Sequence, residues 1–255
     1  NPSIKVIAAP WTCPKWMKVK SLTDLTPLDS WTNGQLNPAY YQDYATYFVK
    51  WVQAFNAEGI DIYAVTPQNE PLNRGNSASL YMSWEEQRDF VKTALGPKFK
   101  AAGLATKIYA YDHNYDYSDI ATEKNYPGKM YEDAAASQYL AGAAYHNYGG
   151  NREELLNIHK AYPEKELLFT ETSIGTWNSG RDLSKRLLED MKEVALGTIN
   201  NWCRGVIVWN LMLDNDRAPN REGGCQTCYG AVDISNSDYK TIIRNSHYYI
   251  IAFAK

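Results

Sequence analysis

Short, nearly continuous apolar segments alternate along the chain with longer segments in which apolar residues recur every three or four positions. The first kind predicts strands over residues 4–10, 60–66, 107–111, 142–145, 167–173 and 205–211. The second kind predicts helices over residues 38–58, 83–102, 131–140, 151–162, 181–202 and 241–253. Residues 19–37 and 214–230 carry neither pattern and are predicted to be loops. Apolar strands that alternate with helices are typical of a parallel sheet covered by helices.

Residues whose side chains can take part in catalysis or in sugar binding follow every predicted strand. They are Trp11, Glu70, Asp112 and His113, His146 and Tyr148, Glu171, and Trp209 and Asn210. A doubly wound open sheet concentrates its function at one switch point. An α/β barrel instead places it at the carboxyl ends of all its strands. We therefore predict an α/β fold of the barrel type, although only six of the eight strands of a closed barrel are found.

Two of these residues are glutamates at the tips of buried strands. Glu70 lies between Asn69 and Pro71, and Pro71 cannot continue a strand ladder. Glu171 ends the apolar segment that begins at Leu167. Cleavage of a glycosidic bond requires two carboxylates, one to protonate the leaving oxygen and one to attack or support the anomeric carbon. A solvated glutamate in a turn is the alternative reading of each residue taken alone.

Composition excludes some classes of protein. The 255 residues carry 26 basic and 29 acidic side chains, a net charge of −3, so there is no basic excess for nucleic acid. No apolar segment approaches the ~18 residues of a membrane-spanning helix. The 20 Tyr and 8 Trp residues suit a large aromatic core, and a few of them at strand tips suit stacking on sugar rings.

The cysteines and histidines argue against a metal site. Cys225 and Cys228 have the spacing of metal ligands, but no second pair lies near them, so zinc is not expected. A local disulfide and two free thiols both remain open for this pair. The four histidines show no ligand spacing, which disfavours a metal hydrolase, and no cofactor is predicted.

Several motifs together resemble glycoside hydrolase family 30, the family of glucosylceramidase and of endo-β-1,6-glucanases. They appear in the family's order across nearly the whole chain: PWT at 10–12, AVT at 64–66, QNEP at 68–71, EQRDF at 86–90, His146 with Tyr148, FTE at 169–171 and WNL at 209–211. The resemblance implies a (β/α)8 barrel in which Glu70 is the acid/base and Glu171 the nucleophile. It also implies that Trp11, Asn69, Tyr148 and Trp209 line the sugar site, and Asn220 matches a family loop position more loosely.

The resemblance also implies that the barrel is incomplete. The first strand corresponds to the third strand of the family, so the first two strands and the accessory β-domain are expected to be absent. Residues 1–255 are then one partial catalytic barrel domain. The loop over residues 214–230, with its two cysteines, departs from the glucosylceramidase pattern beside the site.

Each site residue has a functional and a structural interpretation. Glu70 is expected to be the carboxyl whose pKa is raised, so that it can donate a proton. Asn69 can bond the sugar 2-hydroxyl or cap the turn before Pro71. Trp11 and Trp209 can stack on the sugar or fill the barrel.

The remaining candidates surround this pair. Tyr148 can hydrogen-bond Glu171 or be a buried tyrosine, and Trp177 can form a platform for the leaving group. His146 and His113 are expected to be structural, and Asp112 can support the site or cap a turn.

The predicted function is that of a retaining hydrolase of β-glucosidic bonds, with a β-linked glucan or glucoside as its substrate. Endo-β-1,6-glucanase is the first choice, glucosylceramidase the second and a β-xylanase the third. A catalytically inert carbohydrate-binding fragment is the alternative of another class. The family resemblance implies a secreted, periplasmic or cell-surface location.

Overall fold

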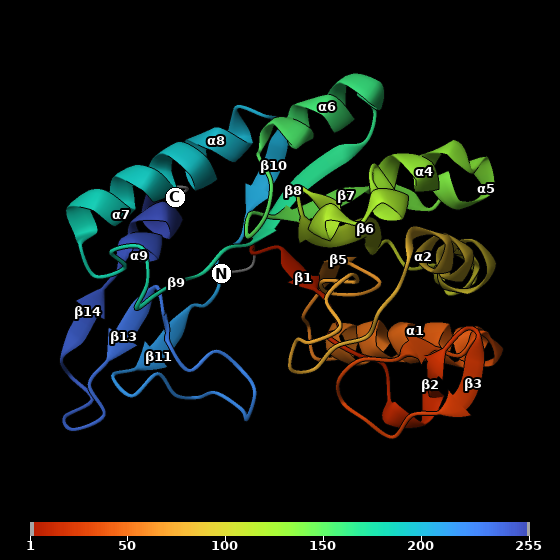
Figure 1. Cartoon of the computed structure of the whole chain (residues 1–255), viewed down its shortest axis with the longest axis horizontal. Coiled ribbons are helices and arrows are strands. Elements are labelled where there is room, and N and C mark those ends of the chain that lie inside the picture. The colour runs from red at the N-terminus through yellow and green to blue at the C-terminus, as the bar shows by residue number, and fades with distance from the viewer. Residues whose placement is uncertain (1–2, 254–255) are drawn as a thin grey trace.

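The computed structural model describes residues 3–253 and is built on one curved sheet of six parallel strands (Figure 1). In spatial order the strands are β1 (Val6–Ala8), β5 (Ile62–Val65), β6 (Lys107–Asn114), β7 (Leu140–His146), β8 (Glu166–Glu171) and β10 (Cys203–Val206). The order in space is the order along the chain, as in one arc of a barrel. Six parallel strands confirm the incomplete barrel, while their numbering as strands three to eight stays a prediction.

Helices connect successive strands and cover the outer face of the arc. They are α1 (Tyr41–Ala57), α2 (Trp84–Phe90), α3 (Gly96–Ala101), α4 (Tyr126–Glu132), α5 (Ala134–Ser137), α6 (Glu153–Ala161), α7 (Leu183–Asp190), α8 (Leu196–Ile199) and α9 (Ser246–Phe253). Single π-helical turns over Val91–Leu95 and Met191–Ala195 join α2 to α3 and α7 to α8. Each of the helices predicted over residues 83–102 and 181–202 therefore follows one continuous course, in which a π-turn interrupts the regular α-helical hydrogen bonding.

Local sequence signals explain where these helices begin. Asn37 accepts a hydrogen bond from the backbone of Ala39, and Pro38 fits the first turn that leads into α1. Ser83 and Glu86 form a complete capping box at the start of α2. The apolar face of α1 brings Tyr44 and Phe48 against Phe90 of α2, with the rings of Tyr44 and Phe90 stacked 5.5 Å apart. Tyr41, Tyr44 and Phe48 of this segment are thus core residues, whereas Tyr47 on the other face is exposed.

Some predicted elements were wrong in detail. Residues 19–37 are not a loop but contain most of a small antiparallel sheet of β2 (Lys18–Ser21), β3 (Asp24–Pro27) and β4 (Gln35–Leu36). These strands are too short to show a period-two pattern. The helix predicted over residues 131–140 begins earlier, at Tyr126, because Pro127 favours a first helical turn there. The last predicted strand, over residues 205–211, ends at Val206, so that Trp209 and Asn210 lie in the loop beyond it.

Two further small sheets lie beyond β10. One contains β11 (Met212–Asp214), β13 (Val232–Ile234) and β14 (Ile242–Arg244), and the other pairs β12 (Cys228–Tyr229) with β9 (Ile174–Gly175). Residues 241–253 were predicted to be one helix, but β14 precedes α9 there. Figure 1 shows β11–β14 and β2–β3 at opposite sides of the molecule.

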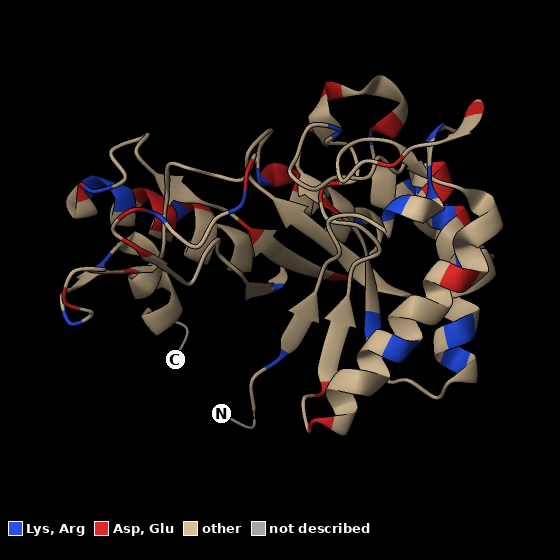
Figure 2. Cartoon of the chain, turned by 90° about the horizontal axis from the view of Figure 1, so that it is seen from below, with Lys and Arg blue, Asp and Glu red and all other residues tan. Residues whose placement is uncertain are grey.

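Charged residues are dispersed over the outer surface. In Figure 2, Lys and Arg are interspersed with Asp and Glu along the helices and loops. Within residues 3–253, no helix is long and apolar enough to cross a membrane.

Candidate active site

Parallel pairing brings the predicted strand tips together at one edge of the sheet. Asn114 at the end of β6 pairs with His146 at the end of β7, and His146 pairs with Glu171 at the end of β8. The backbone N–H of Glu70 donates to the carbonyl of Asp112 at 2.9 Å, which joins the turn after β5 to β6. As a result, one carboxylate oxygen of Glu70, one of Glu171 and one ring nitrogen of His146 all lie within 4.8 Å of one another.

The backbone around Glu70 adopts a conformation that ordinary residues avoid. Glu70 has a φ of 46°, and Tyr111 and Asp112 on the neighbouring strand have φ values of 72° and 77°. Such left-handed residues cost about 1–3 kcal/mol each and cluster at functional sites. The ladder between β6 and β7 shifts register between Tyr111 and His113, so a bulge turns Asp112 toward the site. The side chain of Gln87 holds the bulge by accepting the N–H of Tyr111 at 2.8 Å.

Glu70 is buried, and both of its carboxylate oxygens have partners. Oε2 accepts hydrogen bonds from the side-chain amides of Asn73 and Asn76, each at 2.8 Å. Oε1 lies 3.3 Å from Nδ1 of His146 and 3.9 Å from Nε2 of His113. The Glu70 carboxylate is therefore fixed in orientation before any substrate binds.

His146 bridges Glu70 to Asp112. Its imidazole is completely buried, and Nε2 lies 3.0 Å from Oδ1 of Asp112. Asp112 also accepts hydrogen bonds from the hydroxyls of Thr66, at 2.7 Å, and Thr170, at 2.6 Å. A protonated imidazole can donate to both carboxylates, and burial makes these charge-assisted bonds strong.

Glu171 faces Glu70 and is held by Tyr148. The Tyr148 hydroxyl donates to Oε1 of Glu171 at 2.9 Å, which is the first of the two interpretations that the sequence left open. Tyr148 is 45% exposed, so it is an aromatic of the site surface rather than a core residue.

The pKa values of the two glutamates diverge in the opposite sense from the prediction. Burial alone would raise the pKa of Glu70, but the hydrogen bond and charge of His146, the neighbouring His113 and the amide of Asn73 lower it to about 2. Burial, together with the charges of Glu70 and Asp112, raises the pKa of Glu171 to about 7, although His146 and Tyr148 oppose the rise. The expectation that Glu70 carries the raised pKa was wrong, because the bridging role of His146 cannot be read from the sequence.

The pKa values of His146 and His113 are also shifted in opposite directions. Burial opposes the charged form of His146, but the hydrogen bonds to Asp112 and Glu70 outweigh burial and raise its pKa to about 10. Burial lowers the pKa of His113 to about 4, and the charge of Glu70 only partly offsets this. The free site at neutral pH thus holds a cationic His146 beside an ionised Glu70.

The raised pKa of Glu171 predicts a pH dependence of stability. A carboxyl with a pKa of 4.5 when unfolded and about 7 when folded contributes stability that is fully present below pH 4.5. This contribution is lost as the pH rises through 7 and amounts to about 3 kcal/mol in all. Urea unfolding of the wild type and Glu171→Gln between pH 4.5 and 7 measures it. The wild type should lose stability relative to the variant over this window, and parallel curves would contradict the assignment.

A cavity of about 760 Å³ opens above the two glutamates. Trp11 and Trp209 form one part of its wall, with ring centroids 5.4 Å apart and planes tilted by 38°. The residues that line the cavity include Glu70, Glu171, Trp11, Trp209, Tyr148, Trp177 and Asn220 from the sequence prediction. Asn69, Asp112 and His146 do not line it but lie buried beneath it.

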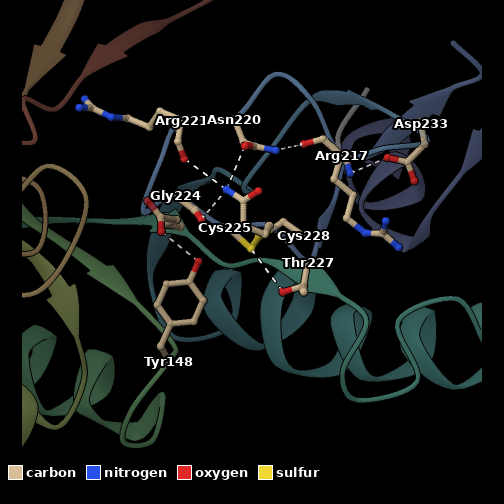
Figure 3. Close-up of a disulfide and its surroundings, with 12 residues drawn as sticks. Tyr148, Arg217, Asn220, Arg221, Gly224, Cys225, Thr227, Cys228 and Asp233 are labelled. Carbon is tan, nitrogen blue, oxygen red and sulfur yellow. Dashed lines mark hydrogen bonds between the residues drawn. A yellow bond between two sulfur atoms is a disulfide. The ribbon is translucent and has the colours of Figure 1, made fainter.

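The loop between β11 and β12 closes one side of the cavity and contains a disulfide between Cys225 and Cys228 (Figure 3). The Gln226 amide donates to the side chain of Asn220 and to the carbonyls of Arg221 and Gly224, at 2.9–3.2 Å. Figure 3 draws Tyr148 below this loop, and the Tyr148 hydroxyl donates to Glu171. The disulfide resolves the choice that the sequence left open.

Other residues of the site were missed by the sequence analysis. Asn73 and Asn76 line the cavity and hydrogen-bond Glu70, and Thr66 and Thr170 hold Asp112. The asparagines lie within seven residues of Glu70, and Asn-rich spacing after a catalytic motif is the signal that could have drawn attention to them.

Glu70, His146 and Glu171 are also the group of described residues that could hold a metal ion. Metal binding requires a free lone pair on an imidazole nitrogen. Both ring nitrogens of His146 already face carboxylates, and its raised pKa keeps it protonated. The geometry therefore suits proton transfer between carboxyls better than metal coordination.

Comparisons with known proteins identify the family of the chain. The family model described as the glycosyl hydrolase family 30 TIM-barrel domain matches residues 1–254. The endo-1,6-beta-D-glucanase BGN16.3 of Trichoderma harzianum is 34% identical over 270 residues, which include 100% of this chain and 50% of the relative. Putative glucosylceramidase 1 of Caenorhabditis elegans is 30% identical over 84% of this chain and 42% of its own length.

A solved structure with much higher sequence identity supports the same family. The structure of the endo-beta1,6-glucanase BT3312 superposes with a TM-score of 0.98 at 91% identity, covering 99% of this chain and 56% of that one. The chain spans about half the length of the curated relatives it matches. By its motifs, its parallel arc of strands and these matches, the chain belongs to glycosyl hydrolase family 30.

Proposed function

We propose that the protein hydrolyses β-1,6-glucan internally, with retention of configuration at the anomeric carbon, and that residues 1–255 form one partial catalytic barrel domain. The observation that carries this proposal is the approach of the two carboxylates to within 4.8 Å at the floor of the cavity. Retaining enzymes hold their carboxyls about 5–5.5 Å apart, whereas inverting enzymes leave about 6.5–9.5 Å for a water molecule. The preference for β-1,6-glucan rests on the two relatives named as endo-1,6-glucanases, one of them 91% identical.

In the first step, an oxygen of Glu171 attacks the anomeric carbon while Glu70 donates its proton to the leaving oxygen. In the second step, Glu70 takes a proton from water, whose oxygen releases the sugar from Glu171. The tyrosine hydroxyl at 2.9 Å keeps Glu171 in line for attack. Trp11 and Trp209 offer apolar faces to the sugar ring, and Asn220 and Trp177 line the same cavity as further candidate contacts, whereas Asn69 lies beneath it.

The proton must be redistributed for this reaction. In the free site, the pKa values place a shared proton on Glu171 and leave Glu70 ionised. In the reacting form, Glu70 is protonated and Glu171 is ionised. This form differs from the free site only in which of the two carboxyls carries the proton. Because the two carboxyls are so close, apparent pKa values from a pH–rate profile belong to the pair.

Hydrolysis of β-1,6-glucan, an aryl β-glucoside and glucosylceramide by the purified chain tests the proposal, with Glu70→Ala as control. We expect reducing ends to appear fastest from β-1,6-glucan and to vanish in the control. Faster cleavage of glucosylceramide would favour the second candidate, which relatives named as putative glucosylceramidases support.

The open edges of the sheet favour one other candidate. Among residues 3–253, strands β1 and β10 each pair on one side only, and such edges invite association with other chains. A folded chain that binds gluco-oligosaccharide without cleaving it would show a carbohydrate-binding unit instead of an enzyme.

The disulfide predicts a change in substrate affinity. Closing so short a loop removes about 2 kcal/mol of chain entropy. The double variant Cys225→Ser with Cys228→Ser must order this loop when sugar binds, so we expect KM to rise about tenfold with little change in kcat. Steady-state kinetics measures this. Reductant should reproduce the effect in the wild type and leave the variant unchanged, whereas an unaltered KM would show that the loop takes no part in binding.

The disulfide also bears on location. Disulfides form and persist in oxidising compartments. It thus supports the proposal that the protein is secreted, periplasmic or on the cell surface.

A further inference from the structure

Beyond the two glutamates, we propose that Asn73 and Asn76 are positioning residues that clamp Oε2 of Glu70 and reserve Oε1 for the transferred proton. This proposal rests on the proposed role of Glu70 as acid/base. We call the two side-chain amides of Asn73 and Asn76 that hold Glu70 the asparagine clamp. Its basis is the pair of 2.8 Å hydrogen bonds that converge on one carboxylate oxygen.

The backbone fixes which end of each amide faces Glu70. Oδ1 of Asn73 accepts the N–H of Gly75 at 3.0 Å, and Oδ1 of Asn76 accepts the N–H of Ser77 at 3.1 Å. Each carbonyl end is thus turned to a backbone donor, which leaves both NH₂ groups for Glu70. A flipped amide would face the carboxylate with its oxygen and lose the backbone bond as well.

A count of lone pairs assigns the proton. A carboxylate oxygen has two lone-pair sites, and the asparagine clamp occupies both of those on Oε2. A proton on Oε2 would have to displace an amide donor. Oε1 has one hydrogen-bond partner, Nδ1 of His146 at 3.3 Å, while Nε2 of His113 lies farther away at 3.9 Å. Oε1 therefore keeps one lone-pair site for the proton that passes to the leaving oxygen.

The segment that carries the clamp is itself anchored at several points. Ser77 donates to the carbonyl of Glu222 in the disulfide loop at 2.9 Å, and the N–H of Ser79 donates to the carbonyl of Trp31 at 3.0 Å. The guanidinium of Arg74 lies 3.7 Å from the ring centre of Tyr81. The clamp is therefore rigid before substrate binds, as positioning of a catalytic acid requires.

The clamp has a specific effect on the chemistry. When the glycosidic C–O bond breaks, the proton on Oε1 of Glu70 passes to the departing oxygen while Glu171 forms its bond to carbon. Partial unfolding of the enzyme would slow the hydrolysis of all substrates to the same extent. A misplaced acid instead slows the hydrolysis of substrates with a poor leaving group, which needs the proton. It leaves the hydrolysis of substrates with an activated phenolate nearly unchanged, because that leaving group does not need the proton.

Asn73→Asp and Asn76→Asp test the clamp sharply. Asp keeps the oxygen that accepts the backbone N–H but replaces the donor to Glu70 by a charged acceptor. For phenyl β-gentiobioside, we expect kcat/KM to fall by about 10²-fold. For the 2,4-dinitrophenyl analogue, kcat/KM should be nearly unchanged. Asn157→Asp is the matched control, because the Asn157 amide donates to the carboxylate of Glu154 at 3.0 Å on the exposed face of α6, outside the cavity.

A second readout does not depend on turnover. Titration of the Glu70 side-chain carbon by NMR should show its pKa rising by at least about one unit in each clamp variant and in Asn76→Ala. The control should leave it in place. The titratable groups that face Glu70 stay unchanged in all these proteins: Tyr111, Asp112, His113, His146, Tyr148 and Glu171.

The outcomes separate the two proposals. An equal fall for both aryl substrates, or an unmoved Glu70 titration in the clamp variants, would overturn the clamp. A wild type that cleaves neither substrate would overturn the proposed function, while the titration would still decide whether the asparagines hold Glu70.

Discussion

Replacing Glu171 by Gln is expected to lower the hydrolysis of β-1,6-glucan by at least about 10⁴-fold. The amide has nearly the shape of the carboxyl but cannot form the ester bond to the anomeric carbon. The hydrogen bond from Tyr148 and the strand that carries residue 171 are retained, so the fold should persist. Reducing-end release under saturating glucan, beside an unfolding curve, measures both.

Glu164→Gln provides the matched control, since Glu164 precedes the same strand and is exposed. It should keep wild-type activity. Binding of gluco-oligosaccharide by Glu171→Gln should remain within a few-fold of the wild type, because the cavity wall is intact. Retained turnover in Glu171→Gln would remove Glu171 as the nucleophile.

Loss of the charge on His146 is expected to produce the largest change in stability. His146→Gln keeps a donor but leaves Glu70 and Asp112 as buried carboxylates without their cation. Removing one partner from a buried charged network costs about 3–5 kcal/mol. The raised pKa of His146 contributes stability that is fully present below pH 6.5 and is lost as the pH rises through about 10. Chemical unfolding at pH 7 measures the difference between wild type and variant.

The pH dependence distinguishes this charge effect from a packing defect. The lowered pKa of Glu70 contributes stability above pH 4.5 that is lost as the pH falls toward 2. The deficit of His146→Gln should therefore be largest near neutral pH and shrink toward both pH 3 and pH 10. His159→Gln, where the imidazole stacks on Trp202 outside the site, is the control. A deficit that is constant with pH would show that His146 acts by filling space alone.

Much of the scaffold follows from local sequence signals. The apolar segments that end in Glu70 and Glu171 predict their strands, and the alternation with helices predicts parallel pairing. Parallel pairing in turn places both glutamates at one edge. The helix predicted over residues 83–102 begins close to where expected, because the capping box of Ser83 and Glu86 is a signal that lies within four residues.

The parts that the sequence did not reveal depend on contacts between distant segments. The pKa order of the two glutamates follows from His146, which lies 76 residues from Glu70 and meets it only through the sheet. The small sheet of β2, β3 and β4 depends on pairing between strands of two to four residues. The clamp was missed for another reason: Asn73 and Asn76 are near Glu70 in sequence, but nothing in a turn-forming segment indicates where an amide points.

The stereochemistry of the first product tests the central account most directly. Proton NMR of β-1,6-gluco-oligosaccharides mixed with the purified chain follows the anomeric signals before they equilibrate. Two glutamates within 4.8 Å predict a double displacement, so the β-anomer of the new reducing sugar should appear first. Initial release of the α-anomer, or no release from a folded chain, would contradict the proposal that Glu171 and Glu70 act as nucleophile and acid/base.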